Sequence, residues 1–416
     1  MKGRRLTTVM LSAGVLALAA ACSSNGGFSS PSSSSTAGAK PNKTPLTLMF
    51  GSSGPAETSA VQAAAAAFTK QSGIKVKVIP ASNLTQQVAQ GFAGNHPPDV
   101  FYLDSLTFQN YAKDGVLDPY APTMPNATGF SPVLKETFSY QGKFICAPKD
   151  VSTDALYVNT QDWQQAGLGA PPANWSQLRA DAQKLTTHGR TGLVLDNSES
   201  GIDMFLYQNG GSVQDRAGNV VLDSQQNVQA LAFVKSMLAS HIMKFPPQLN
   251  AGFSGQAFGE NKAAMVITGP WENGTLQSDY PHIKFKVYPL PAGPTGIHAT
   301  LSFTNCWGVP KDSKNLGGAL AFVKYLTAPQ QEMKFSTAFG VIPSRAAAQA
   351  TYMRAYPQYA AFVRELSYAH PDIAIAGATQ AISAYSSALA QLGSSDPASI
   401  LKTAQRNLQA VVNSSK

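Results

Sequence analysis

Residues 45–55 read PLTLMFGSSGP, and this stretch decides the fold. Residues 45–50 are mostly apolar and are typical of a buried strand, which the Gly- and Ser-rich loop 51–54 ends. An alanine-rich segment from about Glu57 to Gln71 then predicts a helix that stops near Gly73. A strand that leads directly into a helix is the first half of a βαβ unit, so the sequence predicts an α/β protein.

The same alternation continues through residue 115. The sequence predicts a half-exposed strand at 74–79, a helix at 83–93, a strand at 99–104 and a helix at 108–115. Strands joined by helices in this way form a parallel sheet with right-handed crossovers. Because ligands of such open sheets bind at the carboxyl ends of the strands, we expect a site near residues 51–54 and Asp104.

A second αβ region follows Pro148. We expect strands at 154–159, 193–195, 263–268 and 283–289, helices at 163–166, 174–185, 227–240 and 318–326, and a helical C-terminal third. The chain has 416 residues, of which 44% are hydrophobic, and this is too long for one compact core of ordinary size. We therefore expect two lobes.

The first 22 residues have the pattern of a bacterial export signal. Basic residues at 2, 4 and 5 precede an apolar run at 9–18, and three alanines lead to Cys22. This order resembles a lipoprotein signal, in which the cysteine is lipidated. An ordinary secretion signal is the alternative, since Ala19 stands where a leucine is usual. We expect a signal peptide at 1–21 and, at 22–44, a serine-rich flexible tether to the outer face of the cell membrane.

Composition and motifs argue against several classes of protein. The formal net charge is +8, but no basic run carries interleaved aromatics, so we expect no nucleic-acid partner. The six histidines lack the spacing of zinc ligands, and the sequence has no nucleophile elbow, phosphate-binding loop or dinucleotide fingerprint. We therefore expect a protein that is not an enzyme and needs no cofactor or metal.

Six blocks of the sequence, in the order in which they occur, carry information about the family. They are residues 142–148 (GKFICAP), 154–159 (DALYVN), 163–168 (WQQAGL), 258–271 (FGENKAAMVITGPW), 307–310 (WGVP) and 319–326 (ALAFVKYL). Together they resemble the type 1 extracellular solute-binding proteins of ABC importers, the family of maltose-binding protein. The resemblance covers nearly all of residues 45–416.

This resemblance implies a two-lobed periplasmic-binding-protein fold of type II, with the ligand in a cleft between the lobes. The implied N-terminal lobe is 45–150 plus 305–352, the C-terminal lobe is 151–304 plus 353–416, and the crossings fall near 147–152, 302–307 and 350–356. The implied function is that of a monomeric lipoprotein that captures a sugar or oligosaccharide by hinge closure. It would deliver this carbohydrate to the transmembrane permease of an ABC importer.

Three cysteines occur in the chain, Cys22, Cys146 and Cys306. In an oxidising compartment the last two either form a disulfide or remain two separate buried thiols. The resemblance places both on neighbouring crossing segments and so favours the disulfide.

Trp271 is the main candidate for a ligand contact. A sugar has flat apolar faces and a rim of hydroxyls, so its site needs aromatic plates and planar polar groups. Trp271 directly follows a predicted strand and a Gly-Pro pair, and the matching tryptophan of the resembled family stacks on the ligand. Packing beside the hinge is the alternative role. Trp163 and Trp175 are expected in the core, and Trp307 either in hinge packing or in the cleft wall.

Polar and further aromatic side chains complete the expected site. Asp104 ends a strand and is expected to contact the ligand or to cap the next helix. Asp154 follows the first crossing and is expected to contact the ligand or to form a hinge ion pair. The remaining candidates are Ser52, Ser53, Asn197, Asp203, Phe303 and Asn305. The two serines precede a helix whose free N–H groups suit oxygen-rich ligands, although an ordinary turn fits equally well.

Two other functions remain open from the sequence. A binding protein of the same fold could take a polyamine, which needs several convergent carboxylates, or a phosphorylated polyol, which needs an arginine such as Arg345. A secreted carbohydrate-active enzyme is the other alternative, with Asp150 and Asp154 as its pair of carboxylates.

Overall fold

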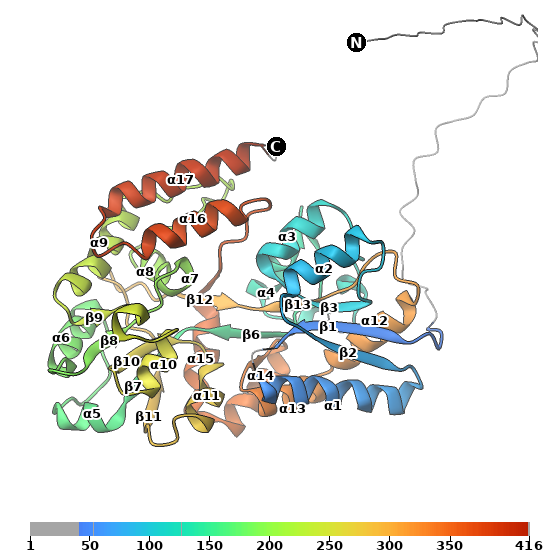
Figure 1. Ribbon diagram of the computed structural model, residues 1–416, viewed down its shortest axis with the longest axis horizontal. Coiled ribbons are helices and arrows are strands. Elements are labelled where there is room, and N and C mark those ends of the chain that lie inside the picture. The colour runs from blue at the N-terminus through green and yellow to red at the C-terminus, as the bar shows by residue number, and fades with distance from the viewer. Residues whose placement is uncertain (1–40, 53, 126, 415–416) are drawn as a thin grey trace, which may run out of the picture. The chain divides into compact units, whose positions relative to one another are not determined.

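The computed structural model describes residues 41–52, 54–125 and 127–414, which form two lobes joined by crossing strands (Figure 1). The expected signal peptide 1–21, Cys22 and Ser53 lie outside these residues. The last residues of the expected tether contact the folded body, because Asn315 Nδ2 donates a hydrogen bond of 2.7 Å to the backbone oxygen of Thr44. Within the described residues, no helix combines the length and apolar character that a membrane span requires.

The first lobe is built on a four-stranded sheet with the order β13-β3-β1-β2. Its strands are β1 (Leu46–Gly51), β2 (Val76–Ala81), β3 (Val100–Asp104) and β13 (Asn305–Gly308). The helices around it are α1 (Pro55–Ser72), α2 (Leu84–Ala93), α3 (Ser105–Lys113), α12 (Leu316–Leu326) and α13 (Pro329–Phe339). The alternation predicted for 45–115 is confirmed, since β1 pairs in parallel with both β2 and β3. The sheet is nevertheless mixed, because β13 returns from the waist and pairs antiparallel with β3.

The second lobe has a five-stranded sheet with the order β11-β7-β10-β8-β9. Its strands are β7 (Ala155–Asn159), β8 (Thr191–Val194), β9 (Met243–Lys244), β10 (Ala263–Thr268) and β11 (Phe285–Tyr288). Its helices are α5 (Thr160–Gln165), α6 (Trp175–Leu185), α7 (Glu199–Ile202), α8 (Met204–Gln208), α9 (Gln225–Ala239), α10 (Ser254–Gly259), α11 (Glu272–Ser278), α16 (Thr379–Leu389) and α17 (Pro397–Ser414). The last two pack against each other at the outer side of this lobe, with α17 on α9 and α16 on α7 (Figure 1).

A third sheet forms the waist between the lobes, with the order β14-β6-β12-β15. Its strands are β14 (Ile342–Pro343), β6 (Asp150–Thr153), β12 (Thr300–Phe303) and β15 (Ala369–Pro371). Close to it in sequence are α4 (Pro132–Thr137), α14 (Ala346–Ala355), α15 (Ala360–Glu365) and the hairpin of β4 (Ser139–Tyr140) with β5 (Lys143–Phe144). The first two predicted crossings coincide with β6 and the β12–β13 connection. The third differs, because residues 350–356 end helix α14 and the chain passes through the waist earlier, at β14.

A disulfide joins the two crossing segments of the first lobe. Cys146 and Cys306 have Cα atoms 5.7 Å apart and their sulfur atoms are bonded. Both side chains are buried, and Cys306 pairs with Leu103 in the β13–β3 ladder. The bond therefore fastens the chain just before β6 to strand β13, within the first lobe's side of the waist.

Each lobe has its own apolar core. In the first lobe, β1 and α1 pack against α12, with Phe68 and Phe322 in ring contact at 4.8 Å between centroids. In the second lobe the core lies under α6, α8 and α9 and contains Trp163 and Trp175, as the sequence predicted. The lobe boundaries 45–150 with 305–352 and 151–304 with 353–416 stay a prediction, and the position of β14 in the waist sheet favours an earlier last boundary, at Ile342–Pro343.

Candidate functional site

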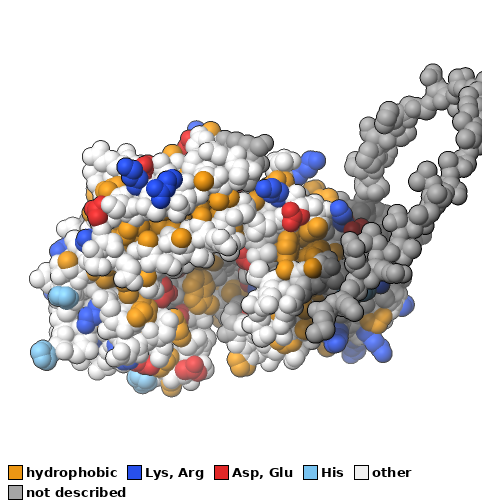
Figure 2. All heavy atoms as spheres, turned by 45° about the horizontal axis from the view of Figure 1, so that its top comes forward, with side chains coloured by type: hydrophobic (Ala, Val, Ile, Leu, Met, Phe, Trp, Pro, Cys, Tyr) orange, Lys and Arg blue, Asp and Glu red, His pale blue; other side chains and the backbone are white. Residues whose placement is uncertain are grey.

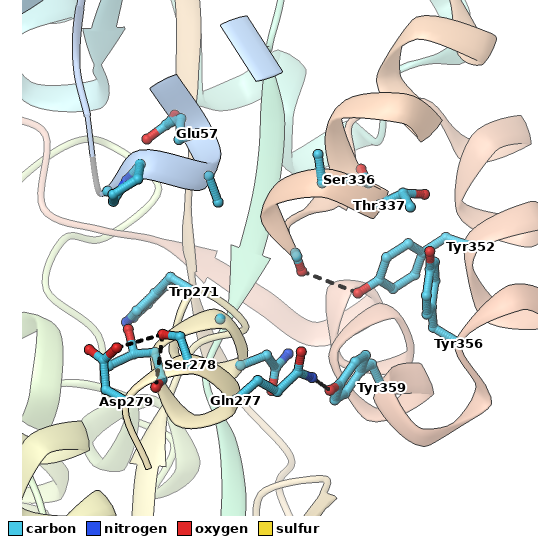
Figure 3. A pocket seen from close by; sticks show the side chains of 18 residues that line it. Glu57, Trp271, Gln277, Ser278, Asp279, Ser336, Thr337, Tyr352, Tyr356 and Tyr359 are labelled. Atoms are coloured by element: carbon cyan, nitrogen blue, oxygen red, sulfur yellow. Dashed lines mark hydrogen bonds between the residues drawn. The ribbon is translucent and has the colours of Figure 1, made fainter. Parts of the chain in front are cut away.

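A cavity of about 540 Å³ lies between the two lobes, within the range of ~300–1,000 Å³ that is common for small-molecule sites. It is lined by the start of α1, by α11, by the end of α13 and by three tyrosines of the segment that begins with α14. Figure 3 shows side chains of α11 facing Glu57 of α1, with the tyrosines closing one side. Because α1 follows β1 and α11 follows β10, the cavity lies at the carboxyl ends of one strand from each lobe.

Trp271 lines the cavity where β10 ends. Gly269 makes its position sterically feasible, since a Cβ at residue 269 would lie 2.0 Å from Cζ3 of the indole ring. Phe303 packs edge-on against the same indole, with 5.5 Å between ring centroids and 82° between the planes. This contact with a waist strand supports the indole as an apolar plate in the cavity wall.

Three tyrosines that the sequence analysis missed also line the cavity, Tyr352, Tyr356 and Tyr359. Tyr352 donates to the backbone oxygen of Gly340 at 3.2 Å, and the Tyr359 hydroxyl accepts from Gln277 Nε2 at 2.9 Å, which links this segment to α11. Their spacing of i, i+4 and i+7 is typical of one helical face, and this signal in the sequence could have identified them. In the structure α14 ends at Ala355, and Tyr359 lies in a separate short 3-10 helix.

Asn273 offers the cavity an unused hydrogen-bond donor. Its side chain is 3% exposed, and its Oδ1 accepts from the Tyr157 hydroxyl at 3.0 Å. Its Nδ2 has no hydrogen-bond partner among the described residues. Because a buried donor without a partner costs about 1–3 kcal/mol, a ligand oxygen that accepts from Nδ2 would recover that free energy.

A buried ion cluster fixes α1 to the waist beside the cavity. Lys149 Nζ lies 3.4 Å from Glu57 Oε1, contacts Asp150 Oδ2, and sits 4.4 Å from the ring centre of Tyr102. Burial raises the pKa of Asp150, and the charge of Lys149 opposes this shift. Asp150 is therefore occupied by an ion pair, so the structure gives no support to its use with Asp154 as a pair of catalytic carboxylates.

Asp104 and Ser52 have local structural roles. Asp104 caps α3, with its Oδ1 accepting from the Thr107 backbone N–H at 2.9 Å and its Oδ2 from the Thr107 hydroxyl at 2.7 Å. Asn305 lies beside it in the β13–β3 ladder. The Ser52 hydroxyl donates to the backbone oxygen of Gly54 at 2.7 Å and lies 2.7 Å from the hydroxyl of Thr58, which closes the first turn of α1. These contacts correspond to the alternatives of a helix cap and an ordinary turn.

Asp154 lies at the base of the second lobe, 4% exposed, with an Oδ2 that has no hydrogen-bond partner among the described residues. Within those residues it forms no ion pair, so the alternative of a hinge ion pair finds no support. Burial and, after it, the charges of Asp196 and Asp372 raise its pKa. Asn197 is half-buried next to Asp196, directly after β8, where the second lobe faces the first.

Two candidates, Trp307 and Asp203, lie in the core rather than in the cleft wall. Trp307 is 3% exposed and packs edge-on against Tyr102, with 5.1 Å between ring centroids, because alternation along β13 turns it into the first-lobe core. Asp203 is 1% exposed and accepts a 2.8 Å hydrogen bond from the Tyr385 hydroxyl, which ties the start of α8 to α16. The position of Trp307 corresponds to the alternative of hinge packing, and the predicted ligand contact of Asp203 gains no support from its buried position.

The arrangement is suited to binding a polar molecule that also has apolar faces. It offers an indole plate, tyrosine rings with hydroxyls, and a free amide donor around one cavity. In the part of the chain that the structure describes, no group of three or more His, Cys, Asp or Glu side chains is placed to hold a metal ion.

Comparisons with known proteins agree with this architecture. Residues 63–362 match the family described as bacterial extracellular solute-binding protein. A protein of Brucella abortus (strain 2308) that is named as a binding protein is 26% identical over 353 residues, covering 82% of this chain and 85% of its own. The arabinooligosaccharide-binding protein of Bacillus subtilis (strain 168) is 25% identical over 256 residues, covering 58% of each chain.

Solved structures share the fold. An ABC substrate-binding protein from Listeria monocytogenes in complex with cycloalternan has a TM-score of 0.79 at 23% identity, covering 89% of this chain and all of its own. The GacH receptor of Streptomyces glaucescens has a TM-score of 0.78 at 22% identity, covering 89% of this chain and 99% of its own. With the family matched over most of the folded chain and the fold shared with two-lobed binding proteins, the chain belongs to the bacterial extracellular solute-binding proteins and has their type II fold.

Proposed function

We propose that this protein captures a sugar or a short oligosaccharide outside the cytoplasm and delivers it to the permease of an ABC importer. The observation that carries the proposal is the cavity between the lobes, with Trp271 and three tyrosines in its walls. Aromatic rings present flat apolar surfaces to the C–H faces of a sugar, while hydroxyl and amide groups pair with its rim. The names of a relative and a structural neighbour, with arabinooligosaccharide and cycloalternan, support a carbohydrate.

Capture would proceed by closure of the lobes about the waist. The cavity takes residues of α1 and α13 from the first lobe and of α11 from the second, so a ligand in it contacts both. A ligand shifts the equilibrium between open and closed forms only by the difference in its affinity for the two. Contacts to both lobes provide that difference, and the closed form is the one we expect the permease to recognise.

The proposed place of action is the outer face of the cell membrane, with lipidated Cys22 as the anchor and residues 22–44 as the tether. The test is to express the full chain and its Cys22→Ala variant and to separate membranes from medium. We expect the wild-type chain in the membrane fraction and the variant in the medium. Equal release of both would contradict the anchor and leave the binding role untouched.

Tryptophan emission gives a direct test of the binding site. The chain has four tryptophans, and Trp163, Trp175 and Trp307 are only 6%, 4% and 3% exposed, so a ligand-induced change in emission reports chiefly on half-exposed Trp271. A panel of neutral and charged oligosaccharides is titrated against the wild-type protein, and binding is measured by calorimetry. The particle dimensions are followed by small-angle X-ray scattering.

We expect at least one carbohydrate to change the emission and to make the particle more compact. Trp271→Ala should weaken its binding by at least about tenfold, and Trp271→Phe, which keeps a ring at this position, should retain part of the affinity. If no carbohydrate on the panel produces heat or an emission change, the proposal of a sugar ligand is wrong.

A further inference from the structure

Two smaller hollows adjoin the cavity between the lobes, and both border strand β11 of the second lobe. The α11 hollow, of about 330 Å³, lies between the end of α11 and the start of β11, and its lining includes Pro281 and Lys284. The η4 hollow, also of about 330 Å³, lies between β11 and the 3-10 helix η4 (Pro357–Tyr359), and its lining includes Gln358. Figure 2 shows the molecule hollowed where the two lobes meet, whereas these two hollows take no residue from the first-lobe helices α1 and α13.

Three side chains are shared between the main cavity and these hollows. Gln277 lines the main cavity and the α11 hollow, and Tyr359 lines the main cavity and the η4 hollow. Phe285 lines both hollows. Gln277 Nε2 donates to the Tyr359 hydroxyl at 2.9 Å, so these two side chains stand together where the three spaces adjoin (Figure 3). Because Gln277 is exposed, a ligand chain can leave the main cavity beside this pair and reach β11.

The surface along β11 is suited to further sugar units. Phe285 and Tyr288 are half-buried and offer ring surface, while Lys286 and Gln358 are exposed and carry N–H donors for hydroxyl groups. In addition, β11 stands at the end of the strand order of its sheet, and an edge strand presents backbone N–H and C=O groups along its outer side. Ring surface beside hydrogen-bonding groups is the same combination that the main cavity offers.

The position of the hollows favours the rest of a bound chain over a separate ligand. A separate molecule that binds along β11 loses its own translational and rotational freedom. A sugar unit that is linked to another unit in the main cavity has already lost most of that freedom, so it meets the surface of β11 at a high effective concentration. Weak contacts along β11 are therefore sufficient to hold a linked unit.

We propose that the ligand is an elongated oligosaccharide, of which one end lies against Trp271 in the main cavity while the further units pass Gln277 and Tyr359 and lie along β11. The inference rests on the proposed function, of which it specifies the size of the ligand and its direction. Contacts along β11 involve the second lobe alone, so they strengthen binding to the open and the closed form equally. A longer chain should therefore bind more tightly without closing the lobes further.

Homologous series of sugars test the effect of chain length. Glucose with α-1,4 links, xylose with β-1,4 links and arabinose with α-1,5 links are each titrated by calorimetry as the single sugar and as chains of increasing length. In at least one series we expect the tetrasaccharide to bind at least about tenfold more tightly than the disaccharide. Small-angle X-ray scattering at saturation should show the same decrease in particle size with both ligands.

Blocking the η4 hollow assigns the gain in affinity to β11. Gln358→Cys is made in the Cys22→Ala protein, whose other two cysteines are bonded to each other, and is modified after folding with cyclohexylmaleimide. The ratio of the tetrasaccharide and disaccharide affinities should then fall to about one. Lys286→Cys, in the same hollow, is the second variant in case the first does not fold. Gln225→Cys is the matched control, because this exposed residue at the start of α9 lines none of the three spaces, and its modification should leave the ratio as in the wild type.

The outcomes separate this inference from the proposed function. Single sugars or disaccharides that bind as tightly as their longer homologues overturn the inference and leave sugar capture standing. An undiminished ratio after modification of the η4 hollow overturns it too, since the gain would then arise elsewhere. A larger decrease in particle size with the tetrasaccharide would mean that the added units bridge the lobes, which also contradicts a path along β11. Binding of no sugar in any series overturns the proposed function together with the inference.

Discussion

Replacing Glu272 by glutamine should flatten the dependence of stability on pH. Glu272 is 2% exposed, and its Oε1 has no hydrogen-bond partner among the described residues. Gly255 packs directly on the carboxyl group, so closely that a Cβ there would lie 1.9 Å from the Glu272 Cδ. Burial is accordingly the larger cause that raises the pKa of Glu272 from 4.5 to about 7, and the charge of Asp196 is the smaller one.

That pKa sets the sign and the size of the contribution that Glu272 makes to the pH dependence of stability. Below pH 4.5 the group is protonated in both the folded and unfolded states, and its full contribution to stability is present. As the pH rises through about 7, the folded state must bury a charge and the contribution is lost. Between pH 5 and pH 8.5 the loss amounts to about 2.5 kcal/mol, or about 3 °C in melting temperature for a chain of this length.

The assay is thermal unfolding by circular dichroism at half-unit pH steps from 5 to 8.5. Glutamine has nearly the shape of glutamate but cannot ionise, so the melting temperature of Glu272→Gln should fall by about 3 °C less than that of the wild type over this range. The other buried carboxylates are present in both proteins, so their share cancels in the comparison. Glu136→Gln, at an exposed position, is the control and should follow the wild-type curve.

Parallel pH curves for wild type and Glu272→Gln would refute the reasoning, because they would mean that the pKa of Glu272 is the same in the folded and unfolded protein.

A second variant tests which of the two causes of the raised pKa of Glu272 is the larger. Asp196→Asn removes the smaller cause and should leave most of the pH dependence in place. Full flattening by Asp196→Asn would show that charge repulsion, not burial, dominates.

Three further predictions concern the cavity, the core and the waist. Gly269→Ala introduces a Cβ 2.0 Å from the indole of Trp271 and should weaken ligand binding by about tenfold or more in calorimetry; unchanged affinity would contradict the role of that contact. Trp307→Ala should lower the free energy of unfolding by about 3–5 kcal/mol in urea titrations, while Trp271→Ala should cost far less, since only Trp307 lies in the first-lobe core. Removing the disulfide with Cys146→Ala and Cys306→Ala should cost about 2–5 kcal/mol, because it closes a loop with a sequence separation of 160; an unchanged denaturation midpoint in reductant would argue that the bond does not contribute.

Local patterns in the sequence were sufficient to predict the secondary-structure elements and the position of one residue of the site, Trp271. The strand predicted at 263–268 is confirmed as β10, and the helix predicted at 174–185 corresponds closely to α6. Trp271 could be placed at a strand end because β10 and the Gly-Pro pair after it are contiguous with it in sequence. Such features depend on neighbours a few residues away, which the sequence displays directly.

The remaining assignments depended on neighbours far away in the chain. Trp307 lies in strand β13, and Trp271 follows strand β10. Only the packing of β13 against β3 buries Trp307 in the first-lobe core. Asp203 follows β8 as Asn197 does, yet Tyr385, 182 residues later, draws it into the interior. The sequence could not rank such candidates, because burial is decided by the element that covers a side chain.

The sequence by itself determined the order of strands and helices, the two-lobed α/β class and the strand end that carries Trp271. Only the tertiary structure decided which side chains meet in the cleft, because the cavity collects residues from segments more than 200 positions apart, such as Glu57 with Tyr352. Periodicity fixes the face on which a residue lies, whereas a binding site is set by which faces come together when the lobes fold around one waist.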